Sequence, residues 1–382
     1  MFTRSLILTA SAAALLLGCN NATSDTTPTV TEPTELEMFQ PSSNPKVEAL
    51  LADMTLDEKL AQISCIWFDK AKVLEKDGSF NPEKMKENFP HGVGCWARPQ
   101  DTFGMEDQGE DRDANDASVT RRMSARTPSQ TVELNNAVQK WHIEETRLGI
   151  PTMFHEEGLH GFQGRYATAF PQSIALAATF DTELVEEDYS VTAREIRVRG
   201  AHHVLSPVVD IAVDPRWGRI EETYGEDVHL VTQMGIAATA GLQGGGEVVG
   251  DDNVISALKH FAAYGQCDGG RNFAPTNVPP RLFKEEILEP FRQVLEQSHV
   301  WGVMPSHSEV DGVPAHGDEA LLTDLLRNEW GFKGVVVSDY HDIHRLDILH
   351  HVCASQEEAA LQGLRAGVSL DFPVGASYLT LI

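Results

Sequence analysis

Short, nearly continuous hydrophobic runs alternate along this chain with longer amphipathic segments. Seven runs have the length and composition of buried strands, at 92–96, 150–154, 204–209, 254–258, 300–304, 334–338 and 368–372. Six segments carry apolar residues at helical spacing, at 129–148, 183–199, 230–242, 281–297, 320–330 and 356–366. Strands that are apolar on both faces and alternate with helices predict a buried parallel sheet. An eighth strand would close this sheet into an α/β barrel of the (β/α)8 type.

One more helix is predicted ahead of the first strand by a capping box. The hydroxyl of Thr55 can cap this helix, while Glu58 reaches back to the backbone N–H of Thr55. The apolar side of the helix then carries Leu60 and Ile63. Together these elements predict a single barrel domain over residues 46–382.

Polar side chains follow five of the predicted strands at the point where each strand ends. They are His155, Glu156, Glu157, Asp210, Lys259, His260, Ser306, His307 and Asp339. In a parallel barrel the carboxyl ends of all strands open on the same face, where active sites lie. Carboxylates, a lysine and several histidines around one cup predict a functional site rather than a structural arrangement.

The first residues of the chain have the features of a secretion signal. Arg4 precedes an uncharged, mostly apolar run at 6–17, and Gly18 and Cys19 follow this run. A basic start, a short apolar core and a small residue before the cleavage point predict a signal peptide at 1–18. The apolar core is too short to span a membrane.

The residues before Cys19 also resemble the bacterial lipoprotein box, in which the cysteine is lipidated. The alternative is an ordinary signal peptide followed by a cysteine without a role. We expect a lipid anchor on the periplasmic or cell-surface side of a bacterial membrane, with the outer membrane as the expected location. Residues 19–45 are rich in Pro, Thr and Ser and predict a flexible tether.

Composition narrows the classes of partner. Hydrophobic residues make up 41% and charged residues 23% of the 382 residues, which is typical of a globular protein. The chain has 30 Lys and Arg against 57 Asp and Glu, a net charge of −27 that argues against nucleic-acid binding. The cysteines after the tether show no metal-binding spacing, and a single disulfide among them stays open: Cys65, Cys95, Cys267 and Cys353.

Eight stretches of the chain occur in the same order in a known family. They are MTLDEK at 54–59, RLGIP at 147–151, HEEGLHG at 155–161, FPQ at 170–172, DPRWGR at 214–219, KHF at 259–261, GFKG at 331–334 and SDY at 338–340. In these motifs the chain resembles the N-terminal barrel domain of glycoside hydrolase family 3. The resemblance extends over roughly residues 46 to 376, nearly everything after the tether.

The resemblance implies roles for individual residues. Asp339 matches the family's catalytic nucleophile, a carboxylate that forms a covalent glycosyl ester in retaining hydrolysis. Four residues match those that bind hydroxyls of the terminal sugar: Glu157, Arg219, Lys259 and His260. Arg271 is a candidate for the pocket rim, with a purely structural role as the alternative. His307 stands where relatives usually carry Tyr, so it is a candidate substrate contact whose role stays open.

The chain departs from the family in two places. Many family glucosidases carry Asp where Glu157 falls, whereas relatives that act on xylosides often carry Glu, so this position favours pentosides without deciding. The general acid/base of most members is a Glu in a following α/β sandwich domain, and this chain ends about ten residues after its last predicted strand. A single-domain branch uses a His–Asp pair instead, but its motif differs from KHFAAYG at 259–265. We therefore expect the sandwich domain, and with it the general acid/base, to lie outside this chain.

These observations predict a retaining, exo-acting β-glycosidase that acts on the non-reducing ends of oligosaccharides or other β-glycosides. A β-glucosidase is the leading expectation, and a β-xylosidase follows closely. Two carboxylates suffice for this chemistry, so no metal and no organic cofactor is implied. The alternative of another class is a surface glycan-binding protein, which would have no need of a carboxylate at Asp339.

Overall fold

The computed structural model describes residues 44–102, 126–246, 248–373 and 376–381. The predicted signal peptide, Cys19 and the tether up to residue 43 lie outside these ranges. The chain divides into two compact units, Met1–Ala52 and Asp53–Ile382. Helix α1 (Pro45–Asp53) belongs to the first unit except for its last residue, and all other elements belong to the second. Within the described ranges, no helix combines the length and the apolar character needed to cross a membrane.

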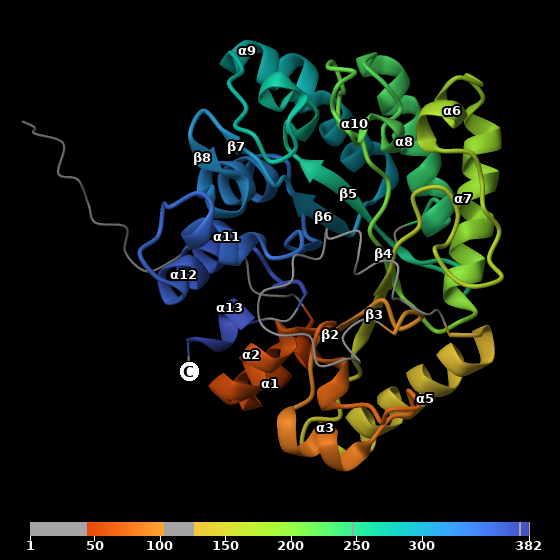
Figure 1. Cartoon of the computed structure of the whole chain (residues 1–382), viewed down its shortest axis with the longest axis vertical. Helices are drawn as coiled ribbons and strands as arrows, with labels where there is room; N and C mark the ends of the chain where they lie inside the picture. Colours follow the sequence, from red (N-terminus) through yellow and green to blue (C-terminus); the bar gives the residue numbers. More distant parts are fainter. Residues whose placement is uncertain (1–43, 103–125, 247, 374–375, 382) are drawn as a thin grey trace, which may run out of the picture. The chain divides into compact units, whose positions relative to one another are not determined.

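Seven parallel strands form the sheet of the second unit, each paired with the next in chain order (Figure 1). They are β1 (Cys65–Ile66), β2 (Cys95–Ala97), β3 (Met153–Glu156), β4 (His203–Val204), β5 (Ile255–Phe261), β6 (Gly302–Pro305) and β9 (Val335–Val336). Six of these coincide with predicted strands. The remaining pair, β7 (Glu309–Val310) and β8 (Val313–Pro314), forms a small antiparallel hairpin after β6.

The seventh predicted run, 368–372, closes the ring. Leu370 forms a parallel bridge with Val337, next to β9, and Asp371 forms one with Ser64, next to β1. The predicted parallel barrel is therefore confirmed. The strand that the sequence pattern missed is β1, because its apolar residues directly continue those of helix α2 and no Gly or Pro separates the two.

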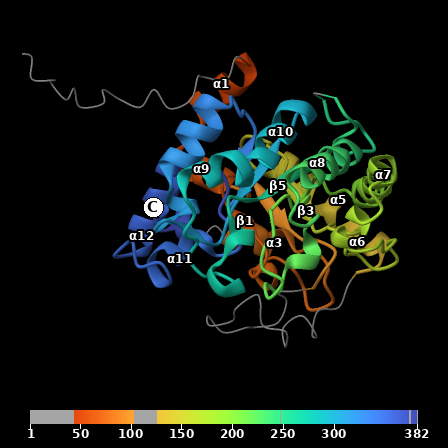
Figure 2. The same ribbon diagram turned by 90° about the horizontal axis from the view of Figure 1, so that it is seen from above.

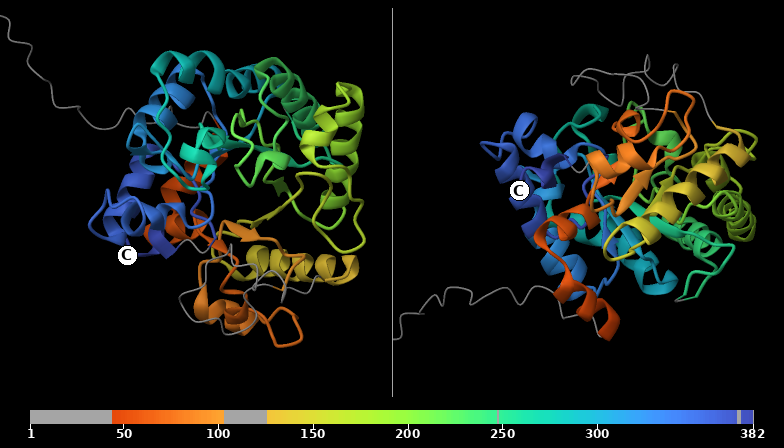
Figure 3. Two further views of the ribbon diagram at one scale, coloured as in Figure 1. Left: turned by 45° about the horizontal axis from the view of Figure 1, so that its top comes forward. Right: turned by 90° about the horizontal axis from the view of Figure 1, so that it is seen from below.

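Helices lie outside the strands of this unit, as Figures 2 and 3 show from above and below. The longer ones are α5 (Pro128–Glu145), α7 (Thr182–Arg197), α8 (Val228–Gln243), α10 (Glu289–Ser298), α12 (Gln356–Ala366) and a π-helical segment at Ala320–Glu329. The shorter ones are α2 (Leu56–Gln62), α3 (Pro82–Asn88), α6 (Ser173–Ala177), α9 (Pro280–Leu282), α11 (Asp342–Ile348) and α13 (Ala376–Leu379). A π-helical turn, Phe283–Ile287, joins α9 to α10.

The predicted capping box begins helix α2. The Thr55 hydroxyl accepts a hydrogen bond from the backbone N–H of Glu58, and Oε2 of Glu58 accepts one from the N–H of Thr55 at 2.9 Å. Arg147, which follows α5, lies 2.6 Å from the same Glu58 oxygen. The cap therefore fixes both the start of α2 and its position against the chain that leads into β3.

Successive residues of each strand alternate between two hydrophobic layers, as the period of a strand requires. Ile66, Trp96, Leu258, Val303 and Val336 pack with helix residues in the outer layer. Their neighbours form an inner layer made of residues on and beside the strands, which includes Cys65, Cys95, Ala257, Met304, Val337 and Leu370. The inner layer fills the barrel and leaves the carboxyl ends of the strands as the open face of the site.

Candidate active site

Five of the nine polar residues predicted at the strand ends line one cavity, whereas His155, Glu156, Asp210 and Ser306 do not line it. Glu157 directly follows β3, Lys259 and His260 lie in β5, His307 follows β6 and Asp339 follows β9. The cavity has a volume of about 360 Å³ and is lined by Glu157, Leu205, Arg219, Glu222, Lys259, His260, Asn272, Phe273, Met304, His307, Asp339 and Tyr340. The barrel geometry thus assembles residues that are far apart in the sequence.

Asp339 lines the cavity and is 5% exposed. Its Oδ1 accepts a hydrogen bond from the backbone N–H of Tyr340 at 2.7 Å, and its own N–H donates to Nε2 of His316 at 2.9 Å. Burial alone would raise the pKa of Asp339, but the positive charges of His307, Arg219 and Lys259 hold this pKa well below its ordinary value. The side chain is therefore a carboxylate at any physiological pH.

His307 bridges two carboxylates. Its Nε2 lies 2.9 Å from Oδ2 of Asp339, and its Nδ1 lies 2.6 Å from Oδ2 of Asp342, the first residue of α11. Burial opposes the charged imidazolium, but the two carboxylates outweigh this effect and raise the pKa of His307. Asp342 is also 2.6 Å from a guanidinium nitrogen of Arg345. The charges therefore alternate from the cavity inward to the protein, in the order carboxylate, imidazolium, carboxylate and guanidinium.

A second chain of contacts ends on Glu157. Its Oε1 accepts a hydrogen bond from the Tyr340 hydroxyl at 3.1 Å, and its Oε2 lies 3.5 Å from Nζ of Lys259. Nε2 of His155 lies 3.2 Å from the same hydroxyl, and Nδ1 of His155 lies 3.4 Å from Sγ of Cys95. Because the hydroxyl donates its proton to the carboxylate, it accepts from Nε2–H of His155. This assigns the proton of the His155 ring to Nε2.

Arg219 and His260 form a third group. Nε and Nη2 of Arg219 donate to Glu222, at 2.9 and 2.7 Å, and Nη2 also lies 3.0 Å from Nε2 of His260. Since arginine can only donate, Nε2 of His260 is an acceptor and its Nδ1–H donates to Asp210 at 2.8 Å. Burial and the charge of Arg219 lower the pKa of His260 well below its ordinary value, which agrees with a neutral ring. Burial also raises the pKa of Asp210 to about 7.

Arg271 does not line this cavity. Its side chain is 72% exposed, and its guanidinium lies 3.6 Å from Asp268 in the same loop. Its predicted place at the pocket rim stays a prediction.

Several residues that line the cavity or lie behind it have no role predicted from the sequence. Tyr340 was visible only as the residue after Asp339, and Asn272 and Phe273 belong to the loop after β5. Asp342 could have been suspected from its position three residues after Asp339, at the start of a helix. His316 comes from the segment after the β7–β8 hairpin, and no motif marks it.

The chain matches a known family over most of its length. The family model described as "Glycosyl hydrolase family 3 N terminal domain" matches residues 55–379. A β-xylosidase of Formosa agariphila is 43% identical over 237 residues, which are 60% of this chain and 33% of that protein. A periplasmic β-glucosidase of Salmonella typhimurium is 36% identical over 326 residues, 85% of this chain and 37% of that protein.

Solved structures agree with this match. A β-glucosidase from Erythrobacter marinus has a TM-score of 0.76 and 38% identity, covering 88% of this chain and 41% of its own. A β-glucosidase from Listeria innocua in complex with glucose has a TM-score of 0.71 and 28% identity, covering 88% of this chain and 42% of its own. The chain thus spans well under half the length of these proteins.

Proposed function

Because the chain belongs to glycoside hydrolase family 3, we propose that it supplies the catalytic barrel of a retaining, exo-acting β-glycosidase. The observation that carries this proposal is the ionised, buried carboxylate of Asp339 at the cavity, with His307 2.9 Å away and a backbone N–H on its other oxygen. A nucleophile of this kind must be charged and held still, and both conditions are met here.

In the proposed reaction Asp339 attacks the anomeric carbon of the terminal sugar. The glycosidic bond breaks, a glycosyl ester of Asp339 forms, and the departing oxygen takes up a proton. Water then attacks the ester, which releases the sugar with retained configuration and restores the carboxylate. The charged neighbours Lys259 and Arg219 support this role, because they stabilise the buried anion.

The remaining lining residues support binding of one sugar ring. Glu157 offers carboxylate oxygens, whereas Lys259 and Arg219 offer donors, and sugar hydroxyls use both kinds of partner. His260 is fixed between Arg219 and Asp210 and lines the cavity. His307 is proposed to act through Asp339, since both of its ring nitrogens face carboxylates.

The general acid is proposed to lie outside this chain. Of the carboxylates that line the described cavity, Glu157 is held by Tyr340 and Lys259, and both oxygens of Glu222 accept from Arg219. Neither points a free carboxyl group at a departing oxygen. A donor from a further domain agrees with the longer chains of the relatives.

A terminal β-glucosyl or β-xylosyl residue is the proposed substrate. Relatives named as a β-xylosidase and as a β-glucosidase match this chain at similar identity. Glu157 favours the smaller sugar, because its extra methylene relative to Asp extends into the space of a hydroxymethyl arm. Both substrates therefore belong in the first assays.

Trapping of the intermediate tests the proposed reaction. The full chain is incubated with activated 2-fluoro glucosides and xylosides, and its peptides are mapped by mass spectrometry. We expect a label on Asp339 and none in Asp339→Asn, which should keep sugar binding because its volume hardly changes. Asp268→Asn, on the exposed loop, serves as the matched control and should be labelled like the wild type. A label on another carboxylate, or binding without any label, would reject the nucleophile and favour a glycan-binding protein.

We further propose that Cys19 is lipidated and anchors the protein to a bacterial membrane on its periplasmic or cell-surface side. The support is the signal-like sequence before it. In the native host, Cys19→Ala should move the protein from the membrane fraction to the soluble fraction, because the acyl chains are the anchor. Cys353→Ala is the matched control. An unchanged distribution of Cys19→Ala would reject the anchor.

A further inference from the structure

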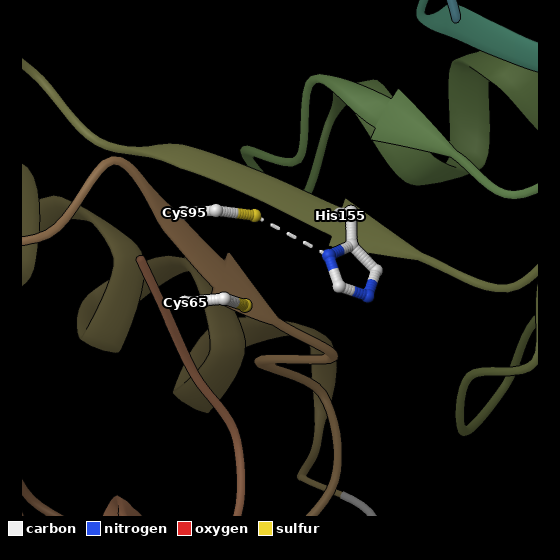
Figure 4. A group of neighbouring side chains, drawn as sticks. All are labelled: Cys65, Cys95 and His155. Atoms are coloured by element: carbon white, nitrogen blue, oxygen red, sulfur yellow. Dashed lines mark hydrogen bonds between the residues drawn. The ribbon is translucent and has the colours of Figure 1, made fainter. Parts of the chain in front are cut away.

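Two cysteines and a histidine meet inside the barrel, below the cavity. Cys65 in β1 and Cys95 in β2 are directly paired, and His155 lies two residues beyond Met153, the partner of Cys95 in β3. Residues two apart on a strand share a face, so all three side chains point into the barrel. Figure 4 shows both sulfur atoms on the side of the His155 ring, with Nδ1 of the ring facing Cys95. All three residues have no exposed surface.

The donor atoms have the spacing of ligands around one ion. The two Sγ atoms and Nδ1 of His155 lie within 4.8 Å of one another, and the Cys95 sulfur is 3.4 Å from that nitrogen. Zinc bonds of about 2.3 Å to sulfur and about 2.0 Å to nitrogen at a tetrahedral angle separate these two atoms by about 3.5 Å. The sulfur of Cys95 and Nδ1 of His155 therefore already have the separation of two ligands of one zinc ion. Sequence spacing could not suggest this, because the three residues come from three different strands.

The hydrogen bonds that lead from the cavity hold His155 in the tautomer that a metal ligand needs. Since Nε2–H of His155 donates to Tyr340, its Nδ1 carries a lone pair, and this lone pair faces the two sulfurs. A metal ligand needs a neutral imidazole in this state, with its other nitrogen hydrogen-bonded. The site thus offers three ligands to an ion, and the hydroxyl of Tyr340 orients one of them, His155.

We propose that Cys65, Cys95 and His155 bind a thiophilic metal ion, Zn²⁺ or Cu⁺. Two soft sulfur ligands and one imidazole suit both ions and disfavour Mg²⁺ and Ca²⁺. On binding, both thiols release their protons to solvent water, two metal–sulfur bonds form, and Nδ1 of His155 donates its lone pair. With Zn²⁺ the group has no net charge, so its burial carries little desolvation cost.

The metal site takes no part in the proposed glycosidase reaction, but hydrogen bonds connect it to a residue of the sugar site. Ligation through Nδ1 keeps the His155 proton on Nε2, the atom that donates to Tyr340 and so supports Glu157. Metal binding would therefore hold the hydrogen-bond chain of the sugar site in one direction.

Metal titration of the purified full chain tests the proposal. Metal is first removed with a chelator under reducing conditions. Zn²⁺ and Cu⁺ are then added to separate samples, and the amount of metal bound per chain is measured by elemental mass spectrometry. Co²⁺ is added to a third sample as a spectroscopic substitute for Zn²⁺. We expect one ion per chain, and thiolate-to-cobalt charge-transfer absorption with Co²⁺. Whichever of Zn²⁺ and Cu⁺ still binds in competition with the other identifies the ion.

Cysteine variants locate the ion. Cys65→Ser and Cys95→Ser should each lose the bound metal and the cobalt absorption, whereas Cys19→Ser, Cys267→Ser and Cys353→Ser should keep both. If a variant in the barrel fails to fold, the wild-type cobalt spectrum decides, because its intensity reports the number of thiolates. Folded wild type without bound metal, cobalt absorption that survives in Cys65→Ser and Cys95→Ser, or a Cys65–Cys95 disulfide in a non-reduced peptide map would each overturn the proposal.

Discussion

Two walls of the cavity, each supported by a residue behind it that does not line it, hold a carboxylate in different ways. The nucleophile wall, made of Asp339, His307 and Asp342, places an imidazolium between two carboxylates at 2.9 and 2.6 Å. The glutamate wall, made of Glu157, Tyr340 and His155, places one carboxylate at the end of a chain of neutral donors, at 3.1 and 3.2 Å.

We infer from this difference that the nucleophile wall determines reactivity and the glutamate wall determines sugar selectivity. On the nucleophile wall each group fixes the charge of the next, and buried charges stay ionised only while all partners are present. On the glutamate wall Tyr340 and His155 are neutral and fix the direction of Glu157, and the charged neighbour of Glu157, Lys259, lies further away at 3.5 Å. We therefore expect changes in the nucleophile wall to alter stability and pH dependence, and changes in the glutamate wall to alter sugar preference.

The proposal that the general acid lies outside this chain leads to the largest expected effect. The 382-residue chain should cleave nitrophenyl glycosides far better than cellobiose or xylobiose. Nitrophenolate leaves without a proton, whereas a sugar does not, and lack of a general acid typically costs about 10²- to 10⁴-fold in rate. The measurement is kcat/KM for both kinds of substrate.

Azide provides the control for this comparison. It needs no general base to attack the glycosyl ester, so it should speed turnover of the nitrophenyl substrate and give a glycosyl azide. Efficient cleavage of the disaccharides without any azide effect would place the acid within this chain. Glu222 and His307 would then be the first residues to replace.

Breaking the nucleophile wall should destabilise the fold. Asp342→Asn removes the carboxylate shared by His307 and Arg345, and loss of one partner from a buried charge pair typically costs about 3–5 kcal/mol of unfolding free energy. Urea denaturation monitored by circular dichroism measures this loss. The exposed Asp324→Asn should change stability by less than about 0.5 kcal/mol. Equal effects of both substitutions would mean that the pairing adds nothing.

The same variant should shift a pH profile. The raised pKa of His307 means that its imidazolium stabilises the fold, fully below the ordinary histidine pKa of about 6.5, and that this contribution is lost as the pH rises through the raised value. The lowered pKa values of Asp339 and Asp342 act oppositely, and their contribution is lost as the pH falls into the acid range. Since Asp342→Asn removes one of the two charges that raise the pKa of His307, the alkaline limb of kcat/KM should move to lower pH. An unmoved limb would assign it to another group.

How far the sequence predicts this molecule differs between its parts. Seven strands could be predicted because each is an apolar run of about five residues, whereas the apolar residues of β1 directly continue those of helix α2. The motifs and strand ends also placed Asp339, Lys259 and His307 correctly around one cavity. Contacts behind the cavity could not be predicted in this way. Asp342 and His155 are ordinary residues of a helix start and a strand, and only the closed barrel brings them to their partners.

A smaller effect is expected on the glutamate wall. Glu157→Asp should raise the ratio of kcat/KM for nitrophenyl glucoside over nitrophenyl xyloside, because the shorter side chain leaves space for the hydroxymethyl arm. One methylene in a pocket is worth about 1–3 kcal/mol of discrimination. Glu221→Asp, next to Glu222 but outside the cavity lining, is the matched control and should leave the ratio unchanged. A constant ratio in both variants would place sugar selectivity elsewhere, with His307 as the next candidate.

The smallest effect should come from Tyr340→Phe. This residue contacts the nucleophile wall through its backbone and the glutamate wall through its hydroxyl, and the substitution removes only the second contact. The backbone N–H of residue 340 still donates to Asp339, whereas the hydroxyl that joins His155 to Glu157 is removed. A hydrogen bond to a charged group contributes about 1.5 kcal/mol, so kcat/KM should fall by roughly tenfold. Lys259 still lies beside Glu157 and limits the loss.

Two controls make this last prediction specific to the glutamate wall. In Tyr224→Phe a buried hydroxyl that bonds to Tyr189, outside the cavity lining, is removed, and kcat/KM should stay unchanged. In a double-mutant cycle with Glu157→Gln, the Tyr340→Phe effect should shrink, because the two residues share one hydrogen bond. The alkaline limb of the pH profile should stay where it is in the wild type, since the nucleophile wall keeps all its charges. A limb that moves in Tyr340→Phe would show that the two walls titrate together, and their separation into reactivity and selectivity would then fail.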